Sequence, residues 1–194
     1  MSYQPHTKER NHLKRKGAKR MSKLTELTTK IEQWSIDRNL HTADPRKQML
    51  KLGEETGELY AGIAKNNDGL IKDSIGDAVV VMTILSQQKE IDFNKLVESV
   101  EKMNWTSRND LNGHTLTLMH HVGMLAAAFE QTGGNTHIMM RLQWVLESLI
   151  DICEALDLDL IECVELAYNE IKDRKGKMID GVFVKEADLQ EVER

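Results

Sequence analysis

Five carboxylates in two neighbouring segments of the sequence fall at the spacing of a helix face. They are Glu54, Glu55, Glu58, Asp73 and Asp77. A helix would place the three glutamates on one face and, in the next segment, the two aspartates on one face. Carboxylates this close oppose each other's ionisation unless a cation lies between them. Oxygen ligands without histidine or cysteine favour Mg²⁺ or Mn²⁺, which points to phosphate chemistry.

The glutamates alone would also be explained as a solvated helix face. Asp77 does not fit that explanation, because it lies in the mostly apolar run 75–85, where an unpaired carboxylate costs free energy. The sequence therefore favours a metal site over a plain acidic surface.

Two helices joined by a short turn are expected to carry these acids. Asp44-Pro45 supplies an N-cap and a proline at the first helical position, which predicts a helix over residues 45–65. The cluster 66–69, Asn-Asn-Asp-Gly, predicts a turn, and the next helix should run from about residue 70 to 85. Antiparallel packing would bring the two acidic faces together.

The rest of the chain also predicts helices. Only Pro5 and Pro45 occur among 194 residues, and apolar residues recur at three- and four-residue intervals. Further helices are expected over 23–39, 94–105, 116–131, 137–156 and 159–172, with a connection at 107–114 that contains Asn112-Gly113. We expect an all-α fold.

The helical layout is repeated along the chain. Residues 96–101 resemble residues 160–165, and residues 57–61 resemble residues 123–127 at an offset of 66 positions. A duplicated helical unit explains this, although amphipathic helices also resemble one another by chance.

The second copy of the unit is expected to be catalytically empty. His120, His121 and Met124 fall where the three glutamates would align. Ordinary polar or partly buried histidines explain the first two better than a metal role. We expect one compact domain with three parts, which are a basic tail over 1–21, a helical unit with the metal site over 22–110 and a second helical unit over 111–194.

The charge of the chain is unevenly distributed. Residues 1–20 hold seven lysines and arginines against one acid, a charge of +6, which leaves −11 elsewhere in a chain of net charge −5. We expect a solvated or disordered tail there. Binding of nucleic acid through phosphates is the alternative, although no DNA-binding motif follows.

The expected setting is the cytoplasm. No apolar run approaches the roughly 18 to 20 residues of a membrane span, and no apolar signal core follows the basic N-terminus. Cys153 and Cys163 have no partners at zinc-site spacing, and a disulfide scaffold is not expected from two cysteines.

The two acidic segments resemble the EExxE and ExxD motifs of the MazG-type all-α nucleoside triphosphate pyrophosphohydrolases. Residues 167–178 and 181–185 are similar to the closing segment of small, often phage-borne MazG-like proteins. The resemblance implies a four-helix core and Mg²⁺, with Mn²⁺ as a substitute. It implies hydrolysis of a (deoxy)nucleoside triphosphate to the monophosphate and pyrophosphate, in a host cytoplasm if the chain is phage-encoded.

The resemblance also implies a homo-oligomer, because family members pair into dimers whose sites use both subunits. The repeated layout of this chain would then be a fused pseudo-dimer with one working site.

Carried over residue by residue, the resemblance assigns metal binding to Glu54, Glu55, Glu58 and Asp77. The glutamate of the ExxD motif is replaced by Ser74, so Asp73, one position earlier on the same face, must stand in for it. Glu54 or Glu55 would orient or deprotonate the water that attacks the α-phosphorus.

A second set of residues is expected to bind the substrate. They are Trp34, Lys51, Asn169, Lys172, Arg174 and Lys185. Lys51 either contacts phosphate or offsets the glutamates. Trp34 either stacks on the base or belongs to the core.

Two alternatives use the same residues. The dimeric dUTPase and dCTPase branch shares the carboxylate scheme and differs mainly in base selection. A catalytically silent helical binding module, with its basic tail on nucleic acid, is consistent with the loss of the motif's glutamate.

Overall fold

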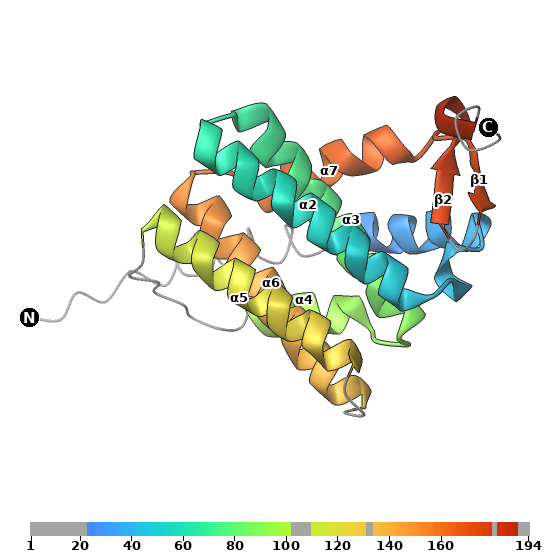
Figure 1. Ribbon diagram of the computed structural model, residues 1–194, viewed down its shortest axis with the longest axis horizontal. Helices are drawn as coiled ribbons and strands as arrows, with labels where there is room; N and C mark the ends of the chain where they lie inside the picture. The colour runs from blue at the N-terminus through green and yellow to red at the C-terminus, as the bar shows by residue number, and fades with distance from the viewer. Residues whose placement is uncertain (1–22, 102–109, 131–133, 180–181, 190–194) are drawn as a thin grey trace, which may run out of the picture.

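The computed structural model describes residues 23–101, 110–130, 134–179 and 182–189. Within them the chain is all-α apart from one small hairpin near the C-terminus, which confirms the expected fold class (Figure 1). The first helix covers residues 23–37. The further elements are η1 Leu40–Thr42, α2 Pro45–Lys65, α3 Asp68–Gln88, α4 Phe93–Glu101, α5 Leu111–Glu130, α6 Asn135–Ala155, α7 Leu160–Ile171, β1 Gly176–Ile179, β2 Val182–Lys185 and η2 Glu186–Asp188.

Side-chain caps set the ends of the two acidic helices. The Asp44 carboxylate accepts a hydrogen bond from the backbone N–H of Arg46 at 2.9 Å, and Pro45 is the first residue of α2, as predicted. Asn66 ends α2 in the left-handed conformation, with φ 51°. Asn67 then caps α3 by accepting from the N–H of Leu70, so α3 begins at Asp68, two residues earlier than predicted.

The connection predicted over residues 107–114 is wrong in its second part. The Asp110 carboxylate accepts from the N–H of Gly113 at 2.8 Å, and α5 begins at Leu111, so Asn112-Gly113 lies in its first turn. An N-terminal cap thus overrides the turn preference of this pair. Residues 102–109 and 131–133, and the basic tail, lie outside the described residues.

The hairpin of β1 and β2 was not predicted. Its strands are antiparallel with Met178 opposite Phe183. Gly176 is required by close packing, because a Cβ there would lie 2.2 Å from the backbone oxygen of Val184. Figure 1 shows the hairpin beside the first helix, at the end of the molecule away from α5 and α6.

Two helix pairs build the core. In the first, α2 and α3 pack along their lengths around fully buried residues such as Leu52 and Ile75. In the second, α5 packs on α6 around Leu125 and Leu149 (Figure 1). The duplication itself remains a prediction, as do the proposed boundaries of the three parts.

Helix α7 packs on the other side of α3. A Cβ at Gly76 would lie 2.2 Å from the backbone oxygen of Cys163, so only glycine allows this approach. The C-terminal end of α7 and the hairpin are thereby held beside the acidic face of α3. None of the described helices is long and apolar enough to cross a bilayer.

Candidate active site

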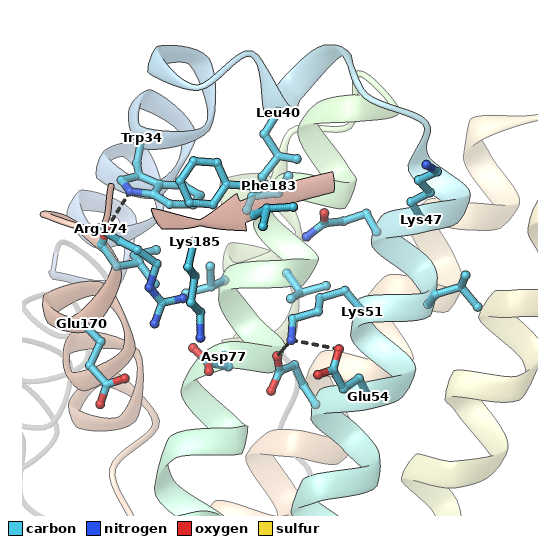
Figure 2. A pocket seen from close by; sticks show the side chains of 18 of the residues that line it. Trp34, Leu40, Lys47, Lys51, Glu54, Asp77, Glu170, Arg174, Phe183 and Lys185 are labelled. Carbon is cyan, nitrogen blue, oxygen red and sulfur yellow. Dashed lines mark hydrogen bonds and ion pairs between the residues drawn. The ribbon is translucent and has the colours of Figure 1, made fainter. Parts of the chain in front are cut away.

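A cavity of about 800 Å³ lies between the first helix, η1, α2, α3, the end of α7 and the hairpin. Its lining has two ends (Figure 2). Asp77, Glu54 and Glu170 lie at one end, and Trp34, Leu40 and Phe183 lie at the other. The cations Lys51, Arg174 and Lys185 point into the space between them.

All five predicted acids line this cavity. They are Glu54, Glu55 and Glu58 from α2 and Asp73 and Asp77 from α3. A sixth acid, Glu170 of α7, also lines the cavity and was not predicted. It lies four residues before Arg174, and this local spacing was its only signal.

Lys51 bridges two of the glutamates. Its Nζ lies 2.9 Å from Glu54 and 2.8 Å from Glu55 (Figure 2). Burial alone would lower the pKa of Lys51, but the hydrogen bonds to Glu55 and Glu54 outweigh this and raise it. Glu55 is 4% exposed, and burial raises the pKa of its carboxyl, with Lys51 opposing the rise. Lys51 therefore neutralises part of the acidic cluster.

Asp77 has the most perturbed carboxyl of the site. Burial and the charges of Glu55 and Asp73 together raise its pKa to about 7, against the opposing charge of Arg174. Asp73 has a buried Oδ1 without a hydrogen-bond partner. A cation bound at such a site would stabilise it by offsetting the charge of the buried carboxylates.

The acids match Mg²⁺ in chemistry but are not arranged around an ion. Among the described residues, no three Asp, Glu, His or Cys side chains converge closely enough to hold a metal as they stand. The ion pairs of Lys51 account for this arrangement, because they turn the carboxylates of Glu54 and Glu55 towards its ammonium group. The Lys51 side chain is 47% exposed, so it has room to move towards solvent or phosphate if a divalent cation binds the two glutamates. The hard oxygen set and the orphaned Asp73 oxygen fit Mg²⁺ on these terms.

Helix packing places Asp73 at the cavity and Ser74 away from it. Ser74 is 1% exposed and does not line the cavity, and its hydroxyl is buried without a partner. Asp73 lines the cavity beside Asp77. The substitute role expected for Asp73 stays a prediction.

The predicted substrate-binding cations separate into two groups. Lys51, Arg174 and Lys185 line the cavity, and Lys47, which the sequence analysis did not name, joins them. Asn169 and Lys172 do not line it. Both are exposed, and the Lys172 ammonium donates to the Asn169 side-chain oxygen at 2.9 Å.

Trp34 lines the aromatic end but is held by protein contacts. It is 8% exposed, and its indole N–H donates to the Ile171 carbonyl at 2.7 Å. Its ring meets Phe183 edge to face at 5.5 Å. The Arg38 guanidinium covers the Trp34 ring at 4.4 Å and donates to the Arg174 carbonyl at 2.8 Å. These contacts give Trp34 a structural role, and leave Phe183 as the half-buried aromatic ring of the cavity.

Arg38 and Phe183 were not predicted as residues of the site. Arg38 ties the first helix to the residue that carries the Arg174 side chain, across 136 positions of sequence. No periodic pattern connects residues so far apart.

The second helix pair contributes nothing to this cavity among the residues described. His121 Nδ1 lies 2.9 Å from the Ser148 hydroxyl and 3.1 Å from the Trp144 carbonyl, and burial lowers the pKa of this histidine. These contacts agree with a partly buried structural histidine.

Comparison with known proteins places the acids in a recognised domain. The family described as MazG nucleotide pyrophosphohydrolase domain matches residues 44–109. All five predicted acids lie in this segment, whereas Trp34, Arg174 and Lys185 lie outside it.

One curated relative comes from Haemophilus phage HP1 (strain HP1c1), and its description is "Uncharacterized 18.2 kDa protein in rep-hol intergenic region". It is 55% identical over 73 residues, which are 37% of this chain and 45% of the phage protein. The chain therefore spans less than half the length of that relative. No solved structure matches the chain.

Proposed function

We propose that the chain hydrolyses a (deoxy)nucleoside triphosphate to the monophosphate and pyrophosphate, because its residues 44–109 match the MazG nucleotide pyrophosphohydrolase domain. The observation that carries the proposal is the cavity, which joins the family's acids to cations from outside the matched segment. Its volume of about 800 Å³ lies within the range of small-molecule sites.

The acids would hold Mg²⁺, with Asp77 and Asp73 on α3 facing Glu55 and Glu58 on α2. Bound there, Mg²⁺ would neutralise phosphate oxygens and lower the pKa of a water molecule. Lys185 and Arg174 would bind the phosphates, because both reach the cavity from the side opposite α2 (Figure 2).

Glu55 is the better candidate for the base that orients the attacking water. Glu55 is 4% exposed, whereas the Glu54 side chain is 56% exposed and would meet bulk water instead. The water would attack the α-phosphorus and lose its proton to Glu55 while the bond to the α,β-bridging oxygen breaks and pyrophosphate leaves.

The test is an assay of all eight common NTPs and dNTPs, with dUTP added, in Mg²⁺ and in EDTA. Orthophosphate should form only when inorganic pyrophosphatase is present, because the product is pyrophosphate. Glu55→Gln should lower kcat at least about a hundredfold, whereas Glu26→Gln, on an exposed glutamate paired with Lys30, should not. Orthophosphate release without pyrophosphatase would refute the proposed bond cleavage.

The same panel separates the alternatives. Exclusive turnover of dUTP or dCTP would assign the chain to the pyrimidine-specific activity. Tight nucleotide binding without turnover would leave a binding module.

We further propose that the chain forms a homo-oligomer. Large apolar side chains are exposed on adjacent helices, with Leu50 of α2 at 77% and Leu116 and Met119 of α5 at 65% and 49%. Static light scattering of the purified chain tests this, and Leu50→Glu with Leu116→Glu should reduce the observed mass. A monomeric wild-type protein would exclude it.

A further inference from the structure

The aromatic end of the cavity has an apolar lining with one uncommitted polar group. Leu40 and Phe183 contribute hydrocarbon and aromatic surface there, and Val81 and Ile84 also line the cavity (Figure 2). Apart from Trp34, whose N–H is bound to the Ile171 carbonyl, Gln48 is the only uncharged polar side chain among the described residues that line the cavity.

Gln48 is buried without using its hydrogen-bonding capacity. It is 8% exposed, yet its amide makes no hydrogen bond with any other described residue. The amide has two N–H donors and one carbonyl acceptor, and neither end is among the fully buried unpartnered atoms, so both are accessible in the cavity that Gln48 lines. A ligand in the cavity could therefore pair with this amide in place of solvent.

The two helices place Gln48 at a fixed distance from the acids. Gln48 precedes Glu55 by seven residues on α2, which is two turns and about 10 Å along the helix axis. Helix α3 runs antiparallel to α2, and its Ile84 follows Asp77 by the same seven residues. At the level of Glu55 the facing residues of α3 are therefore acidic, and at the level of Gln48 they are apolar. If a nucleotide binds with its phosphates at the charged end, its base is the group that lies far enough from the phosphates to reach Gln48.

We propose that Gln48 is the residue that recognises the nucleobase of the substrate, an inference that rests on the proposed function. The base lies in the apolar end against Phe183. Gln48 donates from Nε2 to a base acceptor and accepts at Oε1 from an adjacent base N–H. The class of ligand is a nucleoside triphosphate whose base edge carries a neighbouring donor and acceptor, and Gln48 is its specificity-determining contact.

The experiment measures binding separately from turnover. Isothermal titration in Mg²⁺ uses the α,β-imido analogues of dATP, dCTP, dGTP and dUTP, and inorganic tripolyphosphate as a probe without a base. The variants are Gln48→Met, which keeps the length and removes the amide, and Gln48→Glu, which offers acceptors only. Gln33→Met is the matched control, because Gln33 is exposed on the first helix, is hydrogen-bonded to Asp37 and does not line the cavity.

The wild-type protein should bind at least one analogue more tightly than tripolyphosphate. Gln48→Met should weaken that analogue roughly 10- to 100-fold and leave tripolyphosphate binding unchanged. Gln48→Glu should move the preference towards dGTP, whose N1–H and N2–H₂ are adjacent donors. Gln33→Met should match the wild type.

Several outcomes overturn the inference. An unchanged base ranking in both Gln48 variants excludes base recognition by this residue, even if the enzyme hydrolyses triphosphates. An equal loss of tripolyphosphate binding in Gln48→Met shows a general structural role instead. If the wild type hydrolyses no triphosphate but Gln48→Met loses analogue binding selectively, the proposed function fails and the assignment of Gln48 stands.

Discussion

Replacing Asp77 with asparagine should make the metal-free protein more stable while it removes the metal site. The carboxyl of Asp77 has a pKa of about 7 in the folded protein against an ordinary value of 3.8. The fold therefore disfavours the ionised form, by an amount that reaches about 4 kcal/mol at 1.36 kcal/mol per pKa unit. Asparagine keeps the shape without the charge.

The sign of the pH dependence follows from the raised pKa. Below pH 3.8 Asp77 is protonated in the folded and unfolded chain, and it costs nothing. Between pH 3.8 and about 7 the unfolded chain has lost the proton that the folded chain keeps, so stability falls as pH rises, and the full cost is present above about pH 7. The advantage of Asp77→Asn should be largest at pH 8 and nearly absent at pH 4.

The magnitude expected in the experiment is smaller than this limit, because the buried amide also needs hydrogen bonds and the neighbouring carboxylates relax. A gain of about 1 to 3 kcal/mol at pH 8 corresponds to a rise in Tm of roughly 2 to 12 °C for a chain of this size. Thermal unfolding in EDTA at pH 5 and pH 8 measures it. Asp173→Asn is the control, because Asp173 is exposed and does not line the cavity.

Addition of Mg²⁺ should make the wild type more stable than Asp77→Asn. The ion binds only the folded chain and should raise the Tm of the wild type with increasing concentration, whereas Asp77→Asn should respond weakly. A variant that is less stable than the wild type in EDTA at pH 8, or that shows the same dependence on pH, would refute the account of Asp77 as a desolvated metal ligand.

Three further substitutions test the rest of the site. Asp73→Asn should reduce kcat/KM by roughly 10- to 100-fold, less than Asp77→Asn. The reason is that the Asp73 side chain is shorter than the motif's glutamate and lies one position earlier, so it would reach the metal through water. Equal losses would make Asp73 a direct ligand. Ser74→Glu should lower the free energy of unfolding by about 3 kcal/mol or more, because the position is 1% exposed and away from the cavity. Ser74→Ala is its control, and a stable, more active Ser74→Glu protein would show that the side chain does reach the metal. Arg38→Met should raise KM and lower the Tm, because the variant loses the contact with the Trp34 ring and the bond to the Arg174 carbonyl, about 1 to 3 kcal/mol together. An unchanged KM with a lower Tm would limit Arg38 to stability.

The sequence was sufficient for features that depend on neighbours within a few turns of helix. The all-α fold, the cap at Asp44 and the shared face of the acids all follow from local periodicity and capping, and the structure agrees with them. The prediction of a turn at Asn112-Gly113 was wrong, because the cap from Asp110 outweighs the local preference for a turn.

The tertiary structure decided which of the candidate residues meet. Periodicity places residues on a helix but does not say which angular sector faces a neighbour, so packing alone shows that Asp73 reaches the cavity and Ser74 does not. The same holds for Lys172, which faces solvent, while Arg174 two residues later faces the acids.

The remaining contributions to the site come from contacts between distant parts of the chain. Trp34 donates to the Ile171 carbonyl across 137 positions, and the hairpin brings Phe183 and Lys185 to a cavity whose five predicted acids lie more than a hundred residues earlier. Nothing in the sequence distinguishes Gln48 from other positions of its amphipathic helix. Only the folded structure shows that it lines the cavity together with residues of η1, α3 and the hairpin. Burial changes the chemistry of such groups, and burial depends on the whole fold, so the sequence specified the five predicted acids of this site and the tertiary structure specified Glu170 and their surroundings.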